Sequence, residues 1–169
     1  MIRAATPDDA DDLARIHVTS WRETYTGLLP EAEITSRSLT VRRQQWQNQI
    51  AAGTSRIMLL PGLGFAQAGP QREAALAKTY PQEVYALYLL ASAQGTGQGA
   101  ALLHAATTDA AMTALALATN LPAIQFYRRT GAKILETRIE HIGQAEVRDH
   151  LLGWDAGWKS SFNPANAAS

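Results

Sequence analysis

Cysteine is absent from this chain of 169 residues. A protein without thiols forms no disulfide bond, has no thiol nucleophile and cannot bind a metal through thiolates. The four histidines lie at positions 17, 104, 141 and 150, without the spacing that metal ligands have. The sequence therefore predicts neither a disulfide-stabilised fold nor a metal site.

The chain also lacks an excess of charge and a long apolar segment. Its 15 Lys and Arg balance 15 Asp and Glu, so no net field favours nucleic acid or an anionic membrane. No run approaches the ~18 apolar residues of a membrane span, and no apolar signal segment follows Met1. We expect a cytoplasmic protein without nucleic-acid or membrane partners, and we leave open whether it forms a homodimer.

Hydrophobic periodicity and turn residues predict a mixed α/β sheet with helices on both faces. Thr6 and Pro7 mark the start of the first helix, as N-cap and first helical residue. Strands are expected at 2–5, 56–60, 63–68, 83–90, 112–118, 133–142 and 145–153, and further helices at 31–39, 40–52, 97–109 and 122–130. We expect one domain over 1–158, a loop at 69–81 in which 72–78 could form a helical turn, and a disordered tail at 159–169.

The most informative segment, Gln94–Gly99, reads QGTGQG between a predicted strand and a predicted helix. The first turn of a helix has unpaired N–H groups and a partial positive charge, which suit an anion. Glycines let the backbone approach a pyrophosphate closely. The segment therefore favours a pyrophosphate site, and a strand-to-helix turn without a ligand remains the alternative.

Two nucleotide-binding patterns fit this segment poorly. A dinucleotide site needs a carboxylate at the end of the next strand, where the chain has Thr119 and Asn120. A phosphate-binding loop of nucleotide hydrolases needs Lys and then Ser or Thr after the last glycine, where the chain has Ala100 and Ala101. A dinucleotide-binding domain is thus the weaker alternative.

A second segment, 120–132, has the start and stop residues of a short helix. Pro122 stands at its start, Gly131 just past its end, and Arg128 and Arg129 lie in its last turn, where cations suit the dipole. The segment brings Phe126 and Tyr127 onto this helix about 20 residues after the glycine segment.

Together the two segments resemble the GNAT superfamily of acyl-CoA-dependent N-acetyltransferases. Gln94, Gly97 and Gly99 match the family's pyrophosphate loop, and Asn120, Ala123, Phe126, Tyr127 and Gly131 match a later segment that brings a tyrosine to the thioester sulfur. The resemblance implies the element order β-α-α-β-β-β-α-β-α-β-β, with a splayed strand near Leu89 and Leu90 whose backbone binds the pantetheine arm. It also implies acetyl-CoA as cofactor, bound by Leu89, Ala91, Gln94, Gly95, Thr96, Gly97, Gln98, Gly99, Ala100, Asn120, Ala123 and Phe126.

Acetyl transfer to an amine involves two proton movements, because the amine must lose a proton and the departing thiolate gains one. The resemblance makes Tyr127 the candidate acid and Glu83 the candidate base. A Tyr127 that only packs beside Phe126, and a Glu83 that is only a solvated strand end, remain alternatives. The resemblance makes Trp21, Tyr25 and Glu83 the candidate acceptor-binding residues, and core packing remains the alternative for the aromatic pair Trp21 and Tyr25. The predicted function is N-acetyl transfer to a primary amine of a small molecule, peptide or protein, and the alternative is a non-catalytic acyl-CoA sensor.

Overall fold

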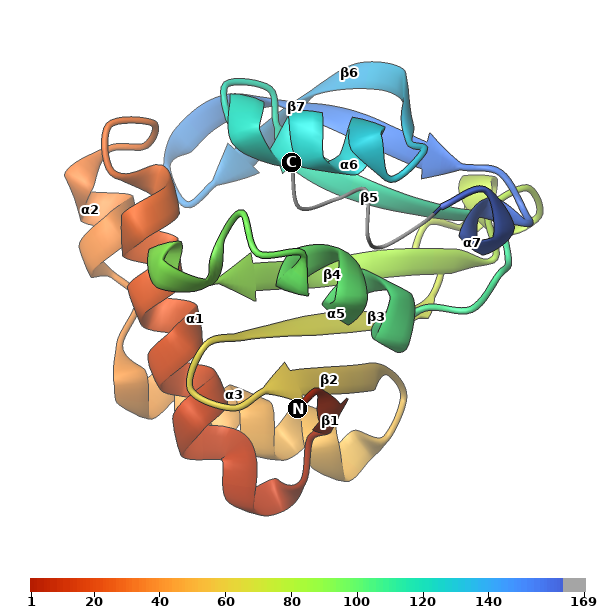
Figure 1. Ribbon diagram of the computed structural model, residues 1–169. Coiled ribbons are helices and arrows are strands. Elements are labelled where there is room, and N and C mark those ends of the chain that lie inside the picture. Colours follow the sequence, from red (N-terminus) through yellow and green to blue (C-terminus); the bar gives the residue numbers. More distant parts are fainter. Residues whose placement is uncertain (163–169) are drawn as a thin grey trace.

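The computed structural model describes residues 1–162, which form one seven-stranded sheet with helices on both faces (Figure 1). The strands are β1 (Arg3–Ala4), β2 (Arg56–Leu60), β3 (Gly64–Pro70), β4 (Gln82–Leu89), β5 (Met112–Leu117), β6 (Lys133–Ile142) and β7 (Ala145–Trp154). The helices are α1 (Ala10–Tyr25), α2 (Glu31–Thr35), α3 (Leu39–Ala52), α4 (Ala74–Ala77), α5 (Gln98–Ala106), α6 (Leu121–Arg129) and α7 (Trp158–Ser161), with 3-10 turns η1 (Pro7–Asp9) and η2 (Ala91–Ala93). The predicted mixed α/β class is confirmed.

The sheet order is β1-β2-β3-β4-β5-β7-β6, and every neighbouring pair is antiparallel except β4 and β5. The parallel pair is short, since β4 bonds to β5 only over Gln82, Glu83 and Val84. A bulge on β4 near Tyr85 shifts its register against β3 at the same level. The two central strands therefore separate beyond Val84, as the predicted splay requires.

Two layers of side chains cover the sheet. On one face, α1 and α3 pack Leu13, Ile16 and Trp46 against Leu59 and Phe65 of β2 and β3. On the other face, the cores under α5 and α6 join Leu102 and Leu103 to residues of β3, β5 and β7. The divergence of β4 from β5 therefore leaves a gap within the sheet, between these two strands.

Several predicted boundaries need correction. The first helix begins with η1, where Asp9 accepts hydrogen bonds from the amide and the hydroxyl of Thr6, and α1 then starts at Ala10. The helix predicted to run to residue 109 ends at Ala106, because Thr107 turns to an extended conformation. The helical turn that could form within 72–78 is the short helix α4, whereas the predicted loop begins later than expected, since β3 continues to Pro70.

The predicted disordered tail is wrong for its first residues, which form α7. The Lys159 ammonium donates to the carbonyls of His104 and Thr107, and the Trp158 indole donates to the carbonyl of Thr108. These contacts hold α7 against the end of α5. The polar composition of the segment gave no indication of them. The rest of the predicted tail, 163–169, lies outside the described residues. Across the part of the chain that the structure describes, no helix is long and apolar enough to cross a membrane.

Candidate active site

The glycine segment forms the turn that leads into α5. Gly95 and Gly97 have φ of +73° and +81°, a left-handed backbone that glycine adopts without strain. Gly97 is the N-cap of α5, and no side chain caps the helix. The first-turn N–H groups of α5 are therefore free to meet an anion.

The second segment forms α6, whose start and end are fixed by side chains. The Asn120 side chain accepts a hydrogen bond from the amide of Ala123 at 3.3 Å and so caps the helix. At the other end, the Thr130 hydroxyl donates to the Tyr127 carbonyl at 2.8 Å and accepts from the Trp154 indole at 3.1 Å. These bonds hold the backbone of Tyr127 in place.

The two segments meet at Gly99 and Phe126. A Cβ on Gly99 would lie 3.1 Å from Leu89 Cδ1 and 3.3 Å from Phe126 Cε2, so a larger residue would require these side chains to shift. The third glycine of the loop thus serves packing between the two motifs.

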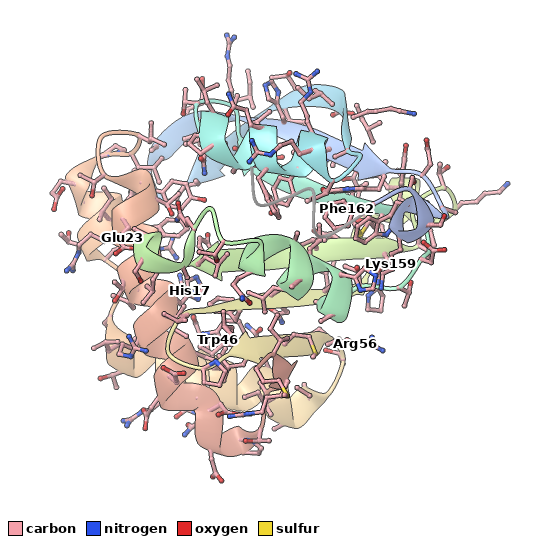
Figure 2. All side chains as sticks on the ribbon, viewed as in Figure 1. His17, Glu23, Trp46, Arg56, Lys159 and Phe162 are labelled. Carbon is pink, nitrogen blue, oxygen red and sulfur yellow. The ribbon has the colours of Figure 1, made fainter. Side chains whose placement is uncertain are left out.

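The end of β4 is the third component of the site. From Tyr85 to Leu89, β4 has no hydrogen-bonded neighbour on the β5 side, so its backbone groups there are open to an extended ligand. The Leu89 carbonyl accepts from the Gln94 side chain at 3.1 Å, and the Ala91 amide donates to Glu23 of α1 at 2.8 Å. Figure 2 shows Glu23 beside the turn that follows β4.

Three tyrosines gather in the gap between β4 and β5, and we call Tyr25, Tyr88 and Tyr127 the phenol cluster. The hydroxyls of Tyr25 and Tyr88 lie 3.5 Å apart. Burial raises the pKa of Tyr127 well above its ordinary value, and the Tyr25 hydroxyl adds to the rise. The Tyr127 ring packs edge-on against Trp154, with ring centroids 5.4 Å apart. The hydroxyl therefore stays protonated at neutral pH.

Glu83 lies at the other end of β4. It is five residues from Tyr88, roughly 15 Å away at ~3.3 Å per strand residue. Its carboxylate accepts from the Arg72 amide and Nε, both at 3.1 Å, and pairs with Arg72 Nη2. Glu83 is thus held by one arginine and is distant from the phenol cluster. Its base role stays a prediction.

The predicted acceptor residues Trp21 and Tyr25 stack on one another in α1, with centroids 4.3 Å apart. Trp21 is buried against Leu117, whereas Tyr25 extends to the phenol cluster. Asp149 of β7 lies opposite Leu117 on this face, and its Oδ1 is buried without a hydrogen-bond partner among residues 1–162. Burial raises the pKa of Asp149.

Sequence reasoning missed Tyr88 and Asp149. The alternation of Ala86, Tyr88 and Leu90 beside the glycine segment could have indicated that Tyr88 faces α1, since alternate strand residues share a face. No local signal could have found Asp149, because the β7 strand reaches the site only through the sheet order.

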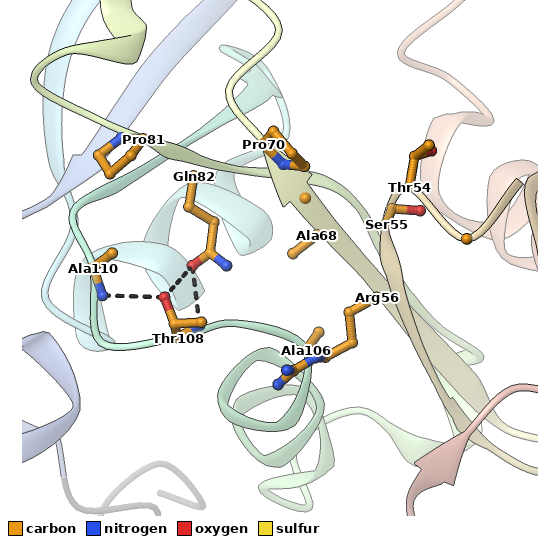
Figure 3. A pocket seen from close by; sticks show the side chains of 12 residues that line it. Thr54, Ser55, Arg56, Ala68, Pro70, Pro81, Gln82, Ala106, Thr108 and Ala110 are labelled. Atoms are coloured by element: carbon orange, nitrogen blue, oxygen red, sulfur yellow. Dashed lines mark hydrogen bonds between the residues drawn. The ribbon is translucent and has the colours of Figure 1, made fainter.

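A wide hollow of about 610 Å³ lies at the other end of α5, away from the glycine segment (Figure 3). Its wall includes Gln82, whose side chain accepts from the amide of Thr108 at 3.1 Å. Among the described residues that line it, Arg56 is the one charged residue and none is Asp, Glu or His, so the lining offers no candidate base.

Comparisons with known proteins agree with this geometry. The Acetyltransferase (GNAT) family matches residues 21–132. A curated relative, the Uncharacterized N-acetyltransferase YuaI of Bacillus subtilis strain 168, is 35% identical over 104 residues, which are 60% of this chain and 59% of the relative. The chain thus spans less than two thirds of that relative's length.

Two solved structures have a similar fold. The PaiA N-acetyltransferase of Thermoplasma acidophilum, in complex with coenzyme A, has a TM-score of 0.72 at 19% identity, covering 92% of this chain and 98% of that one. The ribosomal-protein-alanine N-acetyltransferase of Brucella melitensis has a TM-score of 0.65 at 20% identity, covering 90% of this chain and 98% of the other. At these identities the likeness concerns the fold.

Proposed function

The chain belongs to the acetyltransferase (GNAT) family, and on that basis we propose that it transfers an acetyl group from acetyl-CoA to a primary amine. The observation that supports this best is the convergence of the uncapped start of α5, the open edge of β4 and the Tyr127 hydroxyl in one gap of the sheet. Acetyl-CoA supplies an activated acyl group as its thioester.

The residues of the gap suit the parts of this cofactor. The amides of 95–100 would bind the pyrophosphate, because they begin a helix that no side chain caps. The backbone of β4 between Tyr85 and Leu89 would bond the pantetheine arm in the manner of an added strand. Asn120 and Ala123 would act mainly through the backbone of α6, since the Asn120 side chain caps that helix.

Tyr127 is the proposed acid. Its raised pKa keeps the phenol protonated, and within residues 1–162 its hydroxyl has no protein hydrogen-bond partner. The hydroxyl is therefore free to donate a proton to the departing sulfur. The bonds of Thr130 to the backbone of Tyr127 would keep this donor oriented.

Glu83 remains the proposed base from the family resemblance, acting through intervening water because of its distance from the phenol cluster. Its ion pair with Arg72 would hold the carboxylate in a fixed position. Asp149 is a second candidate, since its partnerless Oδ1 lies on the face that carries Tyr25 and Tyr88. Comparing Glu83→Gln with Asp149→Asn distinguishes the two, because only loss of the base should lower kcat steeply.

The acceptor is expected to be a small molecule, a peptide or a protein amino group. The non-catalytic sensor is the alternative, and retention of Tyr127, whose hydroxyl forms no hydrogen bond within residues 1–162, supports the enzyme.

The test combines binding with activity. Acetyl-CoA should raise the melting temperature of the purified protein, whereas NAD and ATP at the same concentration should not. A panel of amines is then offered with acetyl-CoA, and free thiol release is followed. Saturation by NAD without binding of acetyl-CoA would refute the acetyltransferase, and acetyl-CoA binding without thiol release across the panel would favour the sensor.

A further inference from the structure

On the face of the sheet covered by α1 and α3 lies a cleft of about 470 Å³, which we call the arginine cleft. It is bounded by Arg42 and Gln49 of α3 and floored by Tyr85, Ala86 and Tyr88 of β4. Tyr88 also belongs to the phenol cluster, where its hydroxyl lies 3.5 Å from that of Tyr25. The cleft therefore leads to the place where the acceptor amine would react.

The arginine cleft has positive charge and no negative charge of its own. None of the described residues that line it is Asp or Glu. The Arg42 guanidinium is half-buried and donates to the Gln45 side chain at 2.9 Å, but within residues 1–162 it pairs with no carboxylate. Its neighbour Arg43, in contrast, points away to Asp11 at 3.3 Å. Arg42 thus has an unsatisfied charge at the cleft.

A second arginine, which is not among the residues that line the cleft, also pairs with no carboxylate of residues 1–162. Arg37, in the turn between α2 and α3, stacks its guanidinium over the Trp21 ring at 4.2 Å. Its Nε is buried and has no hydrogen-bond partner in the described part of the chain. Stacking on an indole fixes the plane of a guanidinium and leaves its N–H groups free for a ligand. Arg37 is therefore held in place by Trp21, with an Nε–H that no described residue accepts.

The two arginines act on one another and on His17. Burial, together with the charge of Arg37, lowers the pKa of Arg42. Burial and both arginines lower the pKa of His17 to about 3. Figure 2 shows His17 above Trp46, and their ring centroids are 5.7 Å apart. Two like charges beside a neutral histidine repel, and an anion between them would relieve that repulsion.

We propose that Arg37 and Arg42 bind an oxyanion, a carboxylate or a phosphate, of the acceptor whose amine lies at the phenol cluster. Guanidinium groups bind both oxyanions through paired N–H bonds. The partnerless carboxylate of Asp149, near Tyr25, would attract the ammonium end. The acceptor class is thus an amine that also bears an acid, such as an amino acid. This inference rests on the proposed acetyltransferase function.

Anion binding is tested first without catalysis. Sodium acetate and inorganic phosphate are titrated at constant ionic strength, and tryptophan fluorescence reports on Trp21, which Arg37 covers, and on Trp46, which lines the cleft. We expect a saturable change with at least one anion in the parent and in Arg43→Gln, and at least a tenfold weaker response in Arg37→Gln and Arg42→Gln. The anion that saturates at the lower concentration identifies carboxylate or phosphate as the preferred group.

No saturable response of the parent to either anion, or an unchanged response in Arg42→Gln, would overturn the proposal. The melting shift with acetyl-CoA is measured for every variant, which shows that each one folds. If that shift is absent from the parent, the proposed function fails, whatever the anion titration gives.

Activity provides the second readout. Amines are compared in pairs that differ only in an anionic group, for example an amino acid and its amide. The parent and Arg43→Gln should prefer the acid in kcat/KM by about 10- to 100-fold, the value of a charge-assisted hydrogen bond. Arg42→Gln should lose this preference, because its kcat/KM for the acid should fall by about 10- to 100-fold. A preference for the acid that survives in both Arg37→Gln and Arg42→Gln would contradict the proposal.

Discussion

The two faces of the sheet bind their proposed ligands in different ways. The face under α5 and α6 offers the cofactor backbone groups: the amides of an uncapped helix and the open edge of β4. The face under α1 and α3 offers the acceptor side chains, among them Arg37, Arg42 and Tyr25. Backbone sites need a particular chain geometry, whereas side-chain sites need particular residues brought together from separate elements.

This difference explains how a family with one cofactor can take different acceptors. A backbone site tolerates changes in most side chains as long as its glycines remain. A side-chain site changes its ligand with a single substitution, because charge and hydrogen-bonding capacity belong to the side chain. Tyr127 stands between the two faces, and its removal should have the largest effect.

Tyr127→Phe should lower kcat by about 10²- to 10⁴-fold, the usual contribution of a positioned acid, because the ring and α6 remain while the proton donor is lost. Acetyl-CoA binding should be kept. Steady-state kinetics with an accepted amine and a thermal shift with acetyl-CoA provide the two readouts. Tyr80→Phe, which removes a phenol outside the gap, is the matched control and should keep kcat. An unchanged kcat in Tyr127→Phe, with chemistry rate-limiting, would remove Tyr127 from the mechanism.

Gly97→Val should abolish cofactor binding, because a branched side chain would strain the turn and stand over the amides of α5. Saturation at 100 times Kd stabilises the parent by about 2.7 kcal/mol, and this gain should vanish in the variant. Gly157→Val is the control, since Gly157 is also the N-cap of a helix, with φ of +84°. Both substitutions introduce backbone strain, and only the first should remove the melting shift with acetyl-CoA. Equal binding by Gly97→Val and the parent would refute the loop assignment.

The cofactor face could be predicted from sequence because its signals are local. Gly97, Asn120 and Gly131 each mark the beginning or end of a helix, and the structure confirms α5 and α6. The family match over residues 21–132 confirms the predicted family. The start of α6 was placed within one residue, at Leu121. The end of α5 was not, because Thr107 and Thr108 terminate it through bonds to Leu103 and Gln82 that periodicity does not reveal.

The acceptor face could be predicted only in part. The family resemblance predicted Trp21 and Tyr25 as acceptor residues, and the structure brings Tyr25 to the phenol cluster. Sequence reasoning did not identify Arg37 and Arg42, because a charged residue in a turn or on a polar helix is ordinarily predicted to be exposed to solvent. Their proposed role depends on the lack of a carboxylate partner within residues 1–162, and only the folded structure shows which charges are paired.

The buried His17 on the acceptor face should make the free energy of unfolding depend on pH. The pKa of about 3 in the folded state lies below the ~6.5 of the unfolded chain, so the unfolded state binds more protons between these values. The free energy of unfolding should therefore fall as pH falls from about 6.5 toward 3, by at most about 1.4 kcal/mol per pH unit. Urea unfolding of the parent and His17→Gln at pH 6.5, 5.5 and 4.5 measures this. His141→Gln, at an exposed position, should keep the slope of the parent, and an equal slope in His17→Gln would contradict the assignment.

Hydrogen exchange with and without saturating acetyl-CoA tests the division between the two faces most directly, because it reports on the backbone amides. The account predicts slower exchange at 95–100 and along 85–89 of β4, and no change over residues 42–49 of α3. Protection of α3, with none at 95–100 in a saturated protein, would contradict it.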